Sequence, residues 1–249
     1  AEGERVELQM GVSFVSCENA WENLDAEQKG FAFDTVRSQA AQQWESDLSR
    51  IMVSGGTEKQ KEVFYTALYH ALIHPNILND VNGEYPLMEN AGVGCVPEGE
   101  NRYSVFSLWD TYRNVHQLMT LAYPERQRDM VQSMIGMYKE WGWMPKWELY
   151  GRETFTMEGD PAIPVITDTW LKGIRNIDID TAYEAFVKSA NTPGAENLMR
   201  PDVDPYIEKG YVPLGYYAAD LSGDNSVSHA LEYYIADYAL SLLAKDLGY

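Results

Sequence analysis

The apolar residues of this chain follow two spacings, one near its start and another over the rest of the sequence. In "RVELQMGVSFVS" they occupy every second position from Val6 to Phe14, which is the spacing of a strand with one buried face. An unpaired strand leaves its edges unsatisfied, and the sequence offers no convincing second strand. After this stretch the spacing becomes helical, so the pattern predicts one strand followed by a helical region.

The first predicted helices have recognisable ends. Asp34 suits the N-cap of a helix that runs to about Ile51. Thr57 and Gln60 have the spacing of a capping box, which opens a second helix that Pro75 ends. Both helices carry apolar residues at intervals of three and four, and we therefore expect each to bury one face.

Five more helices are predicted, which makes about seven in all. Pro124 suits the first position of one, and Gly142 suits its C-terminal cap. The stretch "PAIPVITDTWLKG" is apolar nearly all round, so its helix is expected to be buried. Asp180 is predicted to cap a short helix through Ala190. The remaining two are expected at about 104–122 and 228–247.

Composition and charge narrow the function classes. The 249 residues are enough for a substantial core, and no apolar stretch reaches the roughly 20 residues of a membrane span. Lys and Arg number 19 against 38 Asp and Glu, a net charge of −19, with no basic cluster. Nucleic acid and anionic membranes are therefore poor partners. No nucleophile elbow, phosphate loop or dinucleotide fingerprint is present, which leaves serine hydrolase, kinase and dehydrogenase functions unsupported.

The two cysteines, Cys17 and Cys95, are far apart in the sequence and lack metal-ligand spacing, which excludes a zinc site based on them. Whether they pair is left open. The strand without a sheet and the last helix without a tail together suggest a segment of a larger protein.

The stretch "YSVFSLWDTYRNVHQ" places Trp109, Asp110 and Arg113 in a mostly apolar region. At helical spacing Asp110 and Arg113 are neighbours, so they could form an intrahelical ion pair. They could instead open into a polar cavity, because charged groups on an apolar helix need partners. The two interpretations are equally weighted.

A second stretch, "EWGWMPKWELYGRETFTMEGDP", concentrates Trp141, Trp143 and Trp147 beside acidic residues such as Glu153. A sugar offers C–H patches that stack on aromatic rings and hydroxyls that donate to carboxylates, so such a stretch can bind sugars. A tryptophan in a loop can equally cover a core. Glycoside hydrolysis also needs two carboxyl groups across the scissile bond, and the spacing of the many acids does not choose a pair.

Several long strings, in order, resemble the bacterial glycoside hydrolase family 92 mannosidases over nearly the whole chain. They are "FYTALYHALIHPNILNDVNGEY", "YSVFSLWDTYRNVHQLMTLAYPERQRDMVQSMI", "ETFTMEGDPAIPVITDTWLKGI" and "VSHALEYYIADYALSLLAKDLG". The string "GVSFVSCENAWENL" is similar to the exit of that family's N-terminal β-sandwich into a helical linker. The resemblance implies a mainly α fold with 1–16 as the exit strand of the β-sandwich, 17–56 as a helical linker and 57–249 as about half of an (α/α)6 toroid.

The resemblance also implies a secreted or periplasmic, exo-acting, inverting and Ca²⁺-dependent α-mannosidase that trims mannose-containing glycans. The site residues that it implies are Trp109 and Asp110 at the mannose pocket, Arg113 as a brace, and Trp147 and Glu153 of the aromatic stretch. The catalytic acid, the catalytic base and the Ca²⁺ ligands are expected outside this segment. The linkage preference is left open, because Asp160-Pro161 stands where many members have a histidine.

Two alternatives remain for the chain on its own. It could be a catalytically incomplete glycan-binding module, as the missing acid and base suggest. It could also be a structural half-domain that associates with the remainder of the parent chain or with a complementary chain.

Overall fold

The computed structural model describes residues 3, 6–215 and 225–249. The predicted, mainly helical fold is confirmed for these residues. Ten α-helices are present among them: α1 (Cys17–Glu27), α2 (Phe33–Leu48), α3 (Glu58–Ala71), α4 (Leu108–Thr111), α5 (Val115–Ala122), α6 (Pro124–Trp141), α7 (Ala162–Leu171), α8 (Ile179–Asn191), α9 (Val203–Lys209) and α10 (Ser226–Leu247). None of them is long and apolar enough to cross a membrane.

Within the same residues, seven short strands form three small antiparallel sheets. They are β1 (Asn76–Ile77), β2 (Glu84–Pro86), β3 (Val93–Cys95), β4 (Tyr103–Ser104), β5 (Phe106–Ser107), β6 (Trp147–Leu149) and β7 (Arg152–Glu153). A 3-10 turn (Met88–Asn90) follows β2. Strand β1 pairs with β4, β2 with β3, and β5, β6 and β7 form one sheet in that order. The apolar spacing did not indicate these strands, because each has only two or three residues.

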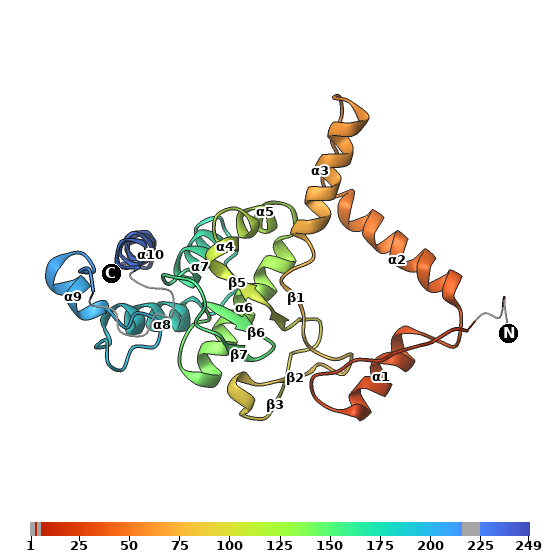
Figure 1. The fold of residues 1–249 in the computed structure, drawn as a ribbon, viewed down its shortest axis with the longest axis horizontal. Helices are drawn as coiled ribbons and strands as arrows, with labels where there is room; N and C mark the ends of the chain where they lie inside the picture. Colours follow the sequence, from red (N-terminus) through yellow and green to blue (C-terminus); the bar gives the residue numbers. More distant parts are fainter. Residues whose placement is uncertain (1–2, 4–5, 216–224) are drawn as a thin grey trace.

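Helices α1, α2 and α3 form an arm beside the body built by α4 to α10; α3 joins the arm to this body, and α1 lies back next to β2 (Figure 1). The arm buries little, and large apolar side chains such as Trp21, Phe31 and Phe33 are more than 60% exposed. Helix α3 begins at the predicted capping box, in which Thr57 accepts a hydrogen bond from the backbone of Gln60 and the Gln60 side chain accepts one in return. The arm therefore has no core of its own, and α3 packs against the main core through Leu68 and Leu72.

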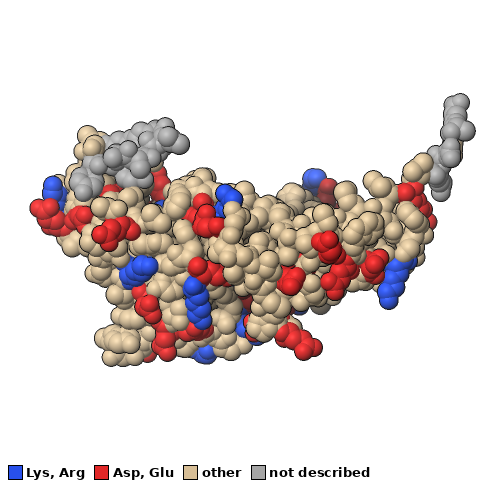
Figure 2. All heavy atoms as spheres, turned by 90° about the horizontal axis from the view of Figure 1, so that it is seen from below, with Lys and Arg blue, Asp and Glu red and all other residues tan. Residues whose placement is uncertain are grey.

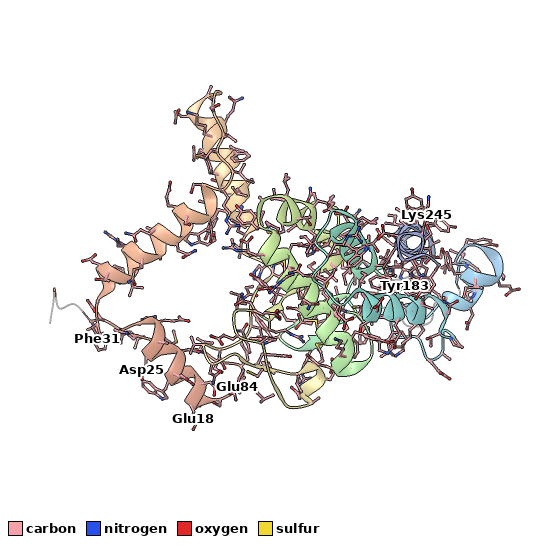
Figure 3. All side chains as sticks on the ribbon, turned by 180° about the vertical axis from the view of Figure 1, so that it is seen from behind. Glu18, Asp25, Phe31, Glu84, Tyr183 and Lys245 are labelled. Atoms are coloured by element: carbon pink, nitrogen blue, oxygen red, sulfur yellow. The ribbon has the colours of Figure 1, made fainter. Side chains whose placement is uncertain are left out.

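A polar cluster attaches α1 to the turn between β1 and β2. Asn19 and Asn23 lie one helical turn apart, and their amide nitrogens donate to Asp80 at 2.9 and 2.7 Å. Asn19 also donates to Glu84 at 2.8 Å, and Figure 3 shows Glu84 beside this helix. Because Asp80 is only 5% exposed, these hydrogen bonds compensate the burial of its charge.

The core is centred on α6 and α7. Pro124 opens α6 and Gly142, with φ of 92°, ends it, as predicted. Helix α7 occupies the stretch predicted as a buried helix and has buried side chains on most of its surface, including Ile163 and Ile166. These helices pack against α5, α8 and α10.

The C-terminal helix α10 is fixed against both α7 and α8. The ring of Tyr183 on α8 stacks on Tyr249 with centroids 4.8 Å apart, and Figure 3 labels Tyr183 and, on α10, Lys245. The Trp170 indole donates to Asp246 at 2.7 Å. These contacts hold α10 beside α7, which brings its other end to the site described below.

Acidic side chains are spread along the face in Figure 2, with fewer basic side chains between them. This distribution matches the net charge of −19 and shows no basic patch on that face. The thiols of Cys17 and Cys95 are both free and exposed, which answers the question of their pairing for this structure.

The predicted helix over 104–122 is wrong in its first half. Ser104 pairs with β1 and Phe106 pairs with β6, so this part is extended and leaves only the four-residue α4 before α5. Val105 between the two strands has φ of 66°, which no helix contains. Asn114, with φ of −159°, separates α4 from α5. Pairing with a distant strand has overridden the local helical spacing.

Other boundaries also differ from the predictions. Residues 6–12 form no strand within the described part of the chain, and Val6, Leu8 and Met10 are more than 70% exposed. The N-cap of α8 is Asp178, whose side chain accepts from the backbone of Thr181, and not Asp180. The division into segments 1–16, 17–56 and 57–249 stays a prediction.

Candidate functional site

The sheet of β5, β6 and β7 separates two sets of side chains because neighbouring residues on a strand point to opposite faces. Ser107 and Trp147 are register partners and share the outer face. Phe106 and Glu148 are partners on the inner face, where neither side chain has measurable exposure. Glu153 faces Glu148 across β6 and β7, so it lies on this inner face too.

Glu148 holds the backbone on both sides of the sheet. Its carboxylate accepts from the Ser104 hydroxyl at 3.0 Å, the Val105 backbone N–H at 3.1 Å and the Gly151 backbone N–H at 2.6 Å. The Val105 contact stabilises a left-handed conformation that a β-branched residue rarely adopts. Burial raises the pKa of Glu148 from 4.5 to about 7, although these hydrogen bonds and Arg102 oppose the shift.

Glu153, one of the predicted site residues, holds the backbone of the hairpin formed by β6 and β7. Its two oxygens accept from the backbone N–H groups of Lys146 at 2.8 Å, Trp147 at 3.0 Å and Phe155 at 2.8 Å. The side chain is 8% exposed. Glu153 therefore fixes the backbone that presents Trp147, and it lies on the other face of the sheet from that indole.

Asp110 is exposed at the first turn of α4, just beyond the end of β5. One of its oxygens accepts a hydrogen bond from the Ser107 hydroxyl. Since Ser107 is the register partner of Trp147, the half-buried Trp147 indole and the Asp110 carboxylate belong to the same outer face. An exposed carboxylate on the same face as an indole is a combination that can accept from a sugar hydroxyl and stack on its C–H face.

Trp109, the neighbour of Asp110 in α4, contacts Arg113. The Arg113 guanidinium carbon lies 4.4 Å from the centre of the Trp109 ring and 4.9 Å from that of Tyr112. Arg113 forms its ion pair with Glu232 of α10, at 3.3 Å, so of the two interpretations the intrahelical pair with Asp110 is replaced by a contact with a distant helix. The structure thus brings Trp109, Asp110, Arg113 and Trp147 to one region and assigns Glu153 to its support.

A buried charged network lies behind this region, and the sequence did not single it out. Arg200 is fully buried and donates to Asp160 at 3.2 Å and to Asp237 at 2.7 Å. Lys146, only 6% exposed, donates to the carbonyl of Met199 at 3.0 Å, and burial lowers its pKa despite nearby carboxylates. Asp160 is thus committed to an ion pair. The spacing along the chain could not reveal these contacts, since Lys146 and Arg200 are distant in sequence.

The family of the chain follows from its match to known proteins. Residues 19–249 match the model of the glycosyl hydrolase family 92 catalytic domain. The chain belongs to this family. The resemblance in the sequence motifs is therefore confirmed, and the site around Asp110 lies within the matched region.

Solved structures of family members agree with the fold. A family 92 α-mannosidase from Bacteroides thetaiotaomicron is 34% identical, with a TM-score of 0.84 over 95% of this chain and 30% of its own length. A family 92 inverting mannosidase from the same species is 30% identical, with a TM-score of 0.85 over 95% of this chain and 31% of its own. The first of these has also been solved in complex with mannoimidazole.

A curated relative from the fungus Arthroderma benhamiae, described as an uncharacterized secreted glycosidase, is 28% identical over 253 residues. The match covers 98% of this chain and 28% of the relative. The chain therefore spans less than a third of the length of the relatives that it matches.

Residues 3, 6–215 and 225–249 contain no group of three or more His, Cys, Asp or Glu side chains that could hold a metal ion. The acids around the site instead accept hydrogen bonds from protein groups. Glu148 and Glu153 accept from the backbone, and Glu232 accepts from Arg113. We therefore assign no step at this site to a metal held by these residues.

Proposed function

We propose that this chain is part of an exo-acting α-mannosidase and supplies one wall of its mannose pocket. The observation that carries the proposal is the exposed Asp110 carboxylate on the same outer face as the Trp147 indole, in a chain of glycosyl hydrolase family 92. The α-mannosidases among its solved relatives, one of them bound to mannoimidazole, support mannose as the sugar.

In this proposal Asp110 accepts hydrogen bonds from mannose hydroxyls, while Trp109 and Trp147 contact the sugar's C–H patches. Ser107 orients the Asp110 carboxylate, and Glu153 fixes the backbone of Trp147. Arg113 braces Trp109 by lying over its ring. The residues of this chain thus bind and orient the sugar, and they do not themselves transfer the proton or activate the water.

The remainder of the mechanism is proposed for the whole protein. Inversion requires a general acid and a general base about 6.5–9.5 Å apart, with water between the base and the sugar. Both carboxyl groups, and the ligands of Ca²⁺, are proposed to lie outside this segment. Bound Ca²⁺ would supply electrostatic stabilisation and help to orient the sugar. The inverting family member with a TM-score of 0.85 supports the stereochemistry.

The architecture and the location are proposed in the same way. Helices α3 to α10 would form about half of an (α/α)6 toroid, preceded by a helical linker and a β-sandwich. The helical content and the match to part of the family structures support this arrangement. Secretion or export to a periplasm is supported by the fungal relative, which is described as secreted.

Release of free mannose from α-linked mannobioses by the full-length protein tests the proposal. The assay is run with Ca²⁺ and again with EDTA, and the anomer first released is followed by NMR. Calcium-dependent release of the inverted anomer is expected. Glycan binding without release in either condition would contradict the proposal and favour a non-catalytic binding module.

A further inference from the structure

Glu232, near the start of α10, is the common acceptor for three side chains of the segment Trp109–Arg113. Its Oε1 accepts from the Trp109 indole N–H at 3.1 Å and from the Arg113 guanidinium at 3.3 Å. Its Oε2 accepts from the Tyr112 hydroxyl at 2.9 Å. One carboxylate from a distant helix thus holds every long side chain of this segment except Asp110.

The environment of Glu232 makes these contacts strong. Its side chain is 13% exposed, so the carboxylate has little water to replace its partners. Burial and Glu232 together raise the pKa of Tyr112 to about 12, so this hydroxyl remains a donor. Arg113 lies over the rings of Trp109 and Tyr112, which adds cation–π attraction to the ion pair. Removal of the Glu232 charge would leave Arg113 without its ion-pair partner.

Gly159 lies directly against the side chain of Glu232 and limits where that side chain can lie. A Cβ atom at this glycine would lie 2.6 Å from the Cβ of Glu232, which is closer than two such atoms approach. Gly159 also has φ of +78°, a conformation that favours glycine. The loop before α7 therefore passes directly against α10 at Glu232 and restricts the directions in which its side chain can extend.

We propose that Glu232 is the positioning residue that sets the orientation of Trp109 in the mannose pocket, acting through the indole N–H and through Arg113. The inference rests on the proposed function, because it takes Trp109 as a wall of that pocket. Glu232 does not touch the sugar. Its carboxylate couples α10 to the pocket wall, so substrate affinity depends on a helix more than 100 residues further along the chain.

The test is Glu232→Gln in the full-length protein. The glutamine oxygen can accept from only some of the three donors, and its amide cannot neutralise Arg113. A misaligned wall weakens binding of substrate and transition state alike, so KM for an α-linked mannobiose is expected to rise about 10-fold with kcat changed by less than about 3-fold. A KM within about 2-fold of the wild-type value would overturn the inference.

Glu184→Gln is the matched control. Glu184 accepts from the Tyr138 hydroxyl at 2.9 Å, the same distance as the pair of Glu232 and Tyr112, but it joins α6 and α8 away from the pocket wall. Its KM is expected to equal that of the wild type. An equal rise in both variants would assign the effect to general loosening and contradict a positioning role.

A double-mutant cycle with Trp109→Ala separates positioning from stability. Alanine has neither the indole N–H nor a ring for Arg113 to cover, so Glu232→Gln should add less than about 3-fold to KM in that background. Fully additive effects would show that Glu232 does not act through Trp109. If the wild-type protein releases no mannose, the proposed function fails. Hydrogen exchange of residues 108–113 would then still test the positioning, because faster exchange in Glu232→Gln is expected and an unchanged rate contradicts it.

Discussion

Glu148 and Glu153 face each other across β6 and β7, and both carboxyl groups are buried under the loop that carries Trp147. Each accepts from a different set of backbone N–H groups: Glu148 from Val105 and Gly151, and Glu153 from residues at either end of the β6–β7 hairpin. Two acids whose residue type alone would suggest catalysis thus shape the backbone of the site.

Glu148→Gln should change the pH dependence of stability. The pKa of Glu148 is higher in the folded protein, about 7, than the ordinary 4.5, so the folded state binds more protons between these values. The contribution of Glu148 to the free energy of unfolding is fully present below pH 4.5 and is lost as the pH rises through 7. The loss is about 3 kcal/mol at most. Glutamine does not titrate, so the loss should be absent. Urea unfolding at pH 4.5 and pH 7.5 measures the free energy of unfolding of both proteins. The same change between these pH values in the variant and the wild type would contradict the raised pKa of Glu148.

Asp110→Asn tests the pocket. The side chain is exposed and its amide oxygen can still accept from Ser107, so folding should be unchanged. A charged hydrogen bond to a sugar hydroxyl contributes about 2–3 kcal/mol, and kcat/KM for mannobiose should therefore fall about 100-fold. Asp34→Asn, an exposed acid on the arm, is the control and should be fully active. Nearly normal activity of Asp110→Asn would remove Asp110 from the site.

Asp80→Ala should detach α1 from the body. The change removes an acceptor that Ser13, Asn19 and Asn23 share. Asn19 keeps Glu84 and Asn23 keeps the Val12 carbonyl as acceptors, so one N–H of each buried amide is left unpaired, at a cost of about 1–3 kcal/mol. Faster hydrogen exchange is expected in α1, with no change in α6. Glu22→Ala, which removes only an exposed contact to Asn82, should leave the exchange rate of α1 unchanged. Protection of α1 in the Asp80 variant would show that other contacts hold the helix.

Local signals predicted some helix ends correctly, whereas the N-caps predicted at Asp34 and Asp180 are wrong, because the structure places these caps at Ala32 and Asp178. Thr57 with Gln60 and Pro124 with Gly142 act within a few residues, and the structure uses all four as predicted. The region before α4 was not predictable from such signals. Its two strands, β4 and β5, form only through pairing with strands distant in sequence. No spacing near Val105 indicates that Glu148 will hold its backbone.

The site shows the same limit. Trp109, Asp110 and Trp147 could be selected as residue types that suit a sugar, and the family resemblance implied that they share a pocket. The partner of Arg113 could not be selected, since local spacing offers only Asp110 while the fold supplies Glu232 from α10. Glu153 was selected for its charge. The register of the sheet buries its side chain, and its carboxylate therefore accepts from backbone N–H groups. Contacts between distant segments decide what each acid does.

His116 is a buried titratable group whose effect on the pH dependence of stability opposes that of Glu148. Its hydrogen bonds fix its tautomer. The hydroxyl of Thr169 donates to the carbonyl of Val165, so it must accept from the amide nitrogen of Gln127. The Gln127 oxygen then faces His116 Nδ1 at 3.1 Å, which must carry the proton. His116 Nε2 is left to accept from the hydroxyl of Thr111, at 3.0 Å, in α4 beside Asp110.

Protonation of His116 is opposed by burial, which lowers its pKa from 6.5 to about 4. The folded state therefore binds fewer protons in this range, and the contribution of His116 to stability, about 3 kcal/mol at most, is present above pH 6.5 and lost as the pH falls to 4. Glu148 has the reverse dependence over nearly the same range, so the two effects largely cancel in the wild type. Glu148→Gln should therefore become more stable as the pH rises from 4.5 to 6.5, whereas His116→Gln should become less stable. Urea unfolding across this range measures both slopes, and slopes of the same sign would refute this opposition.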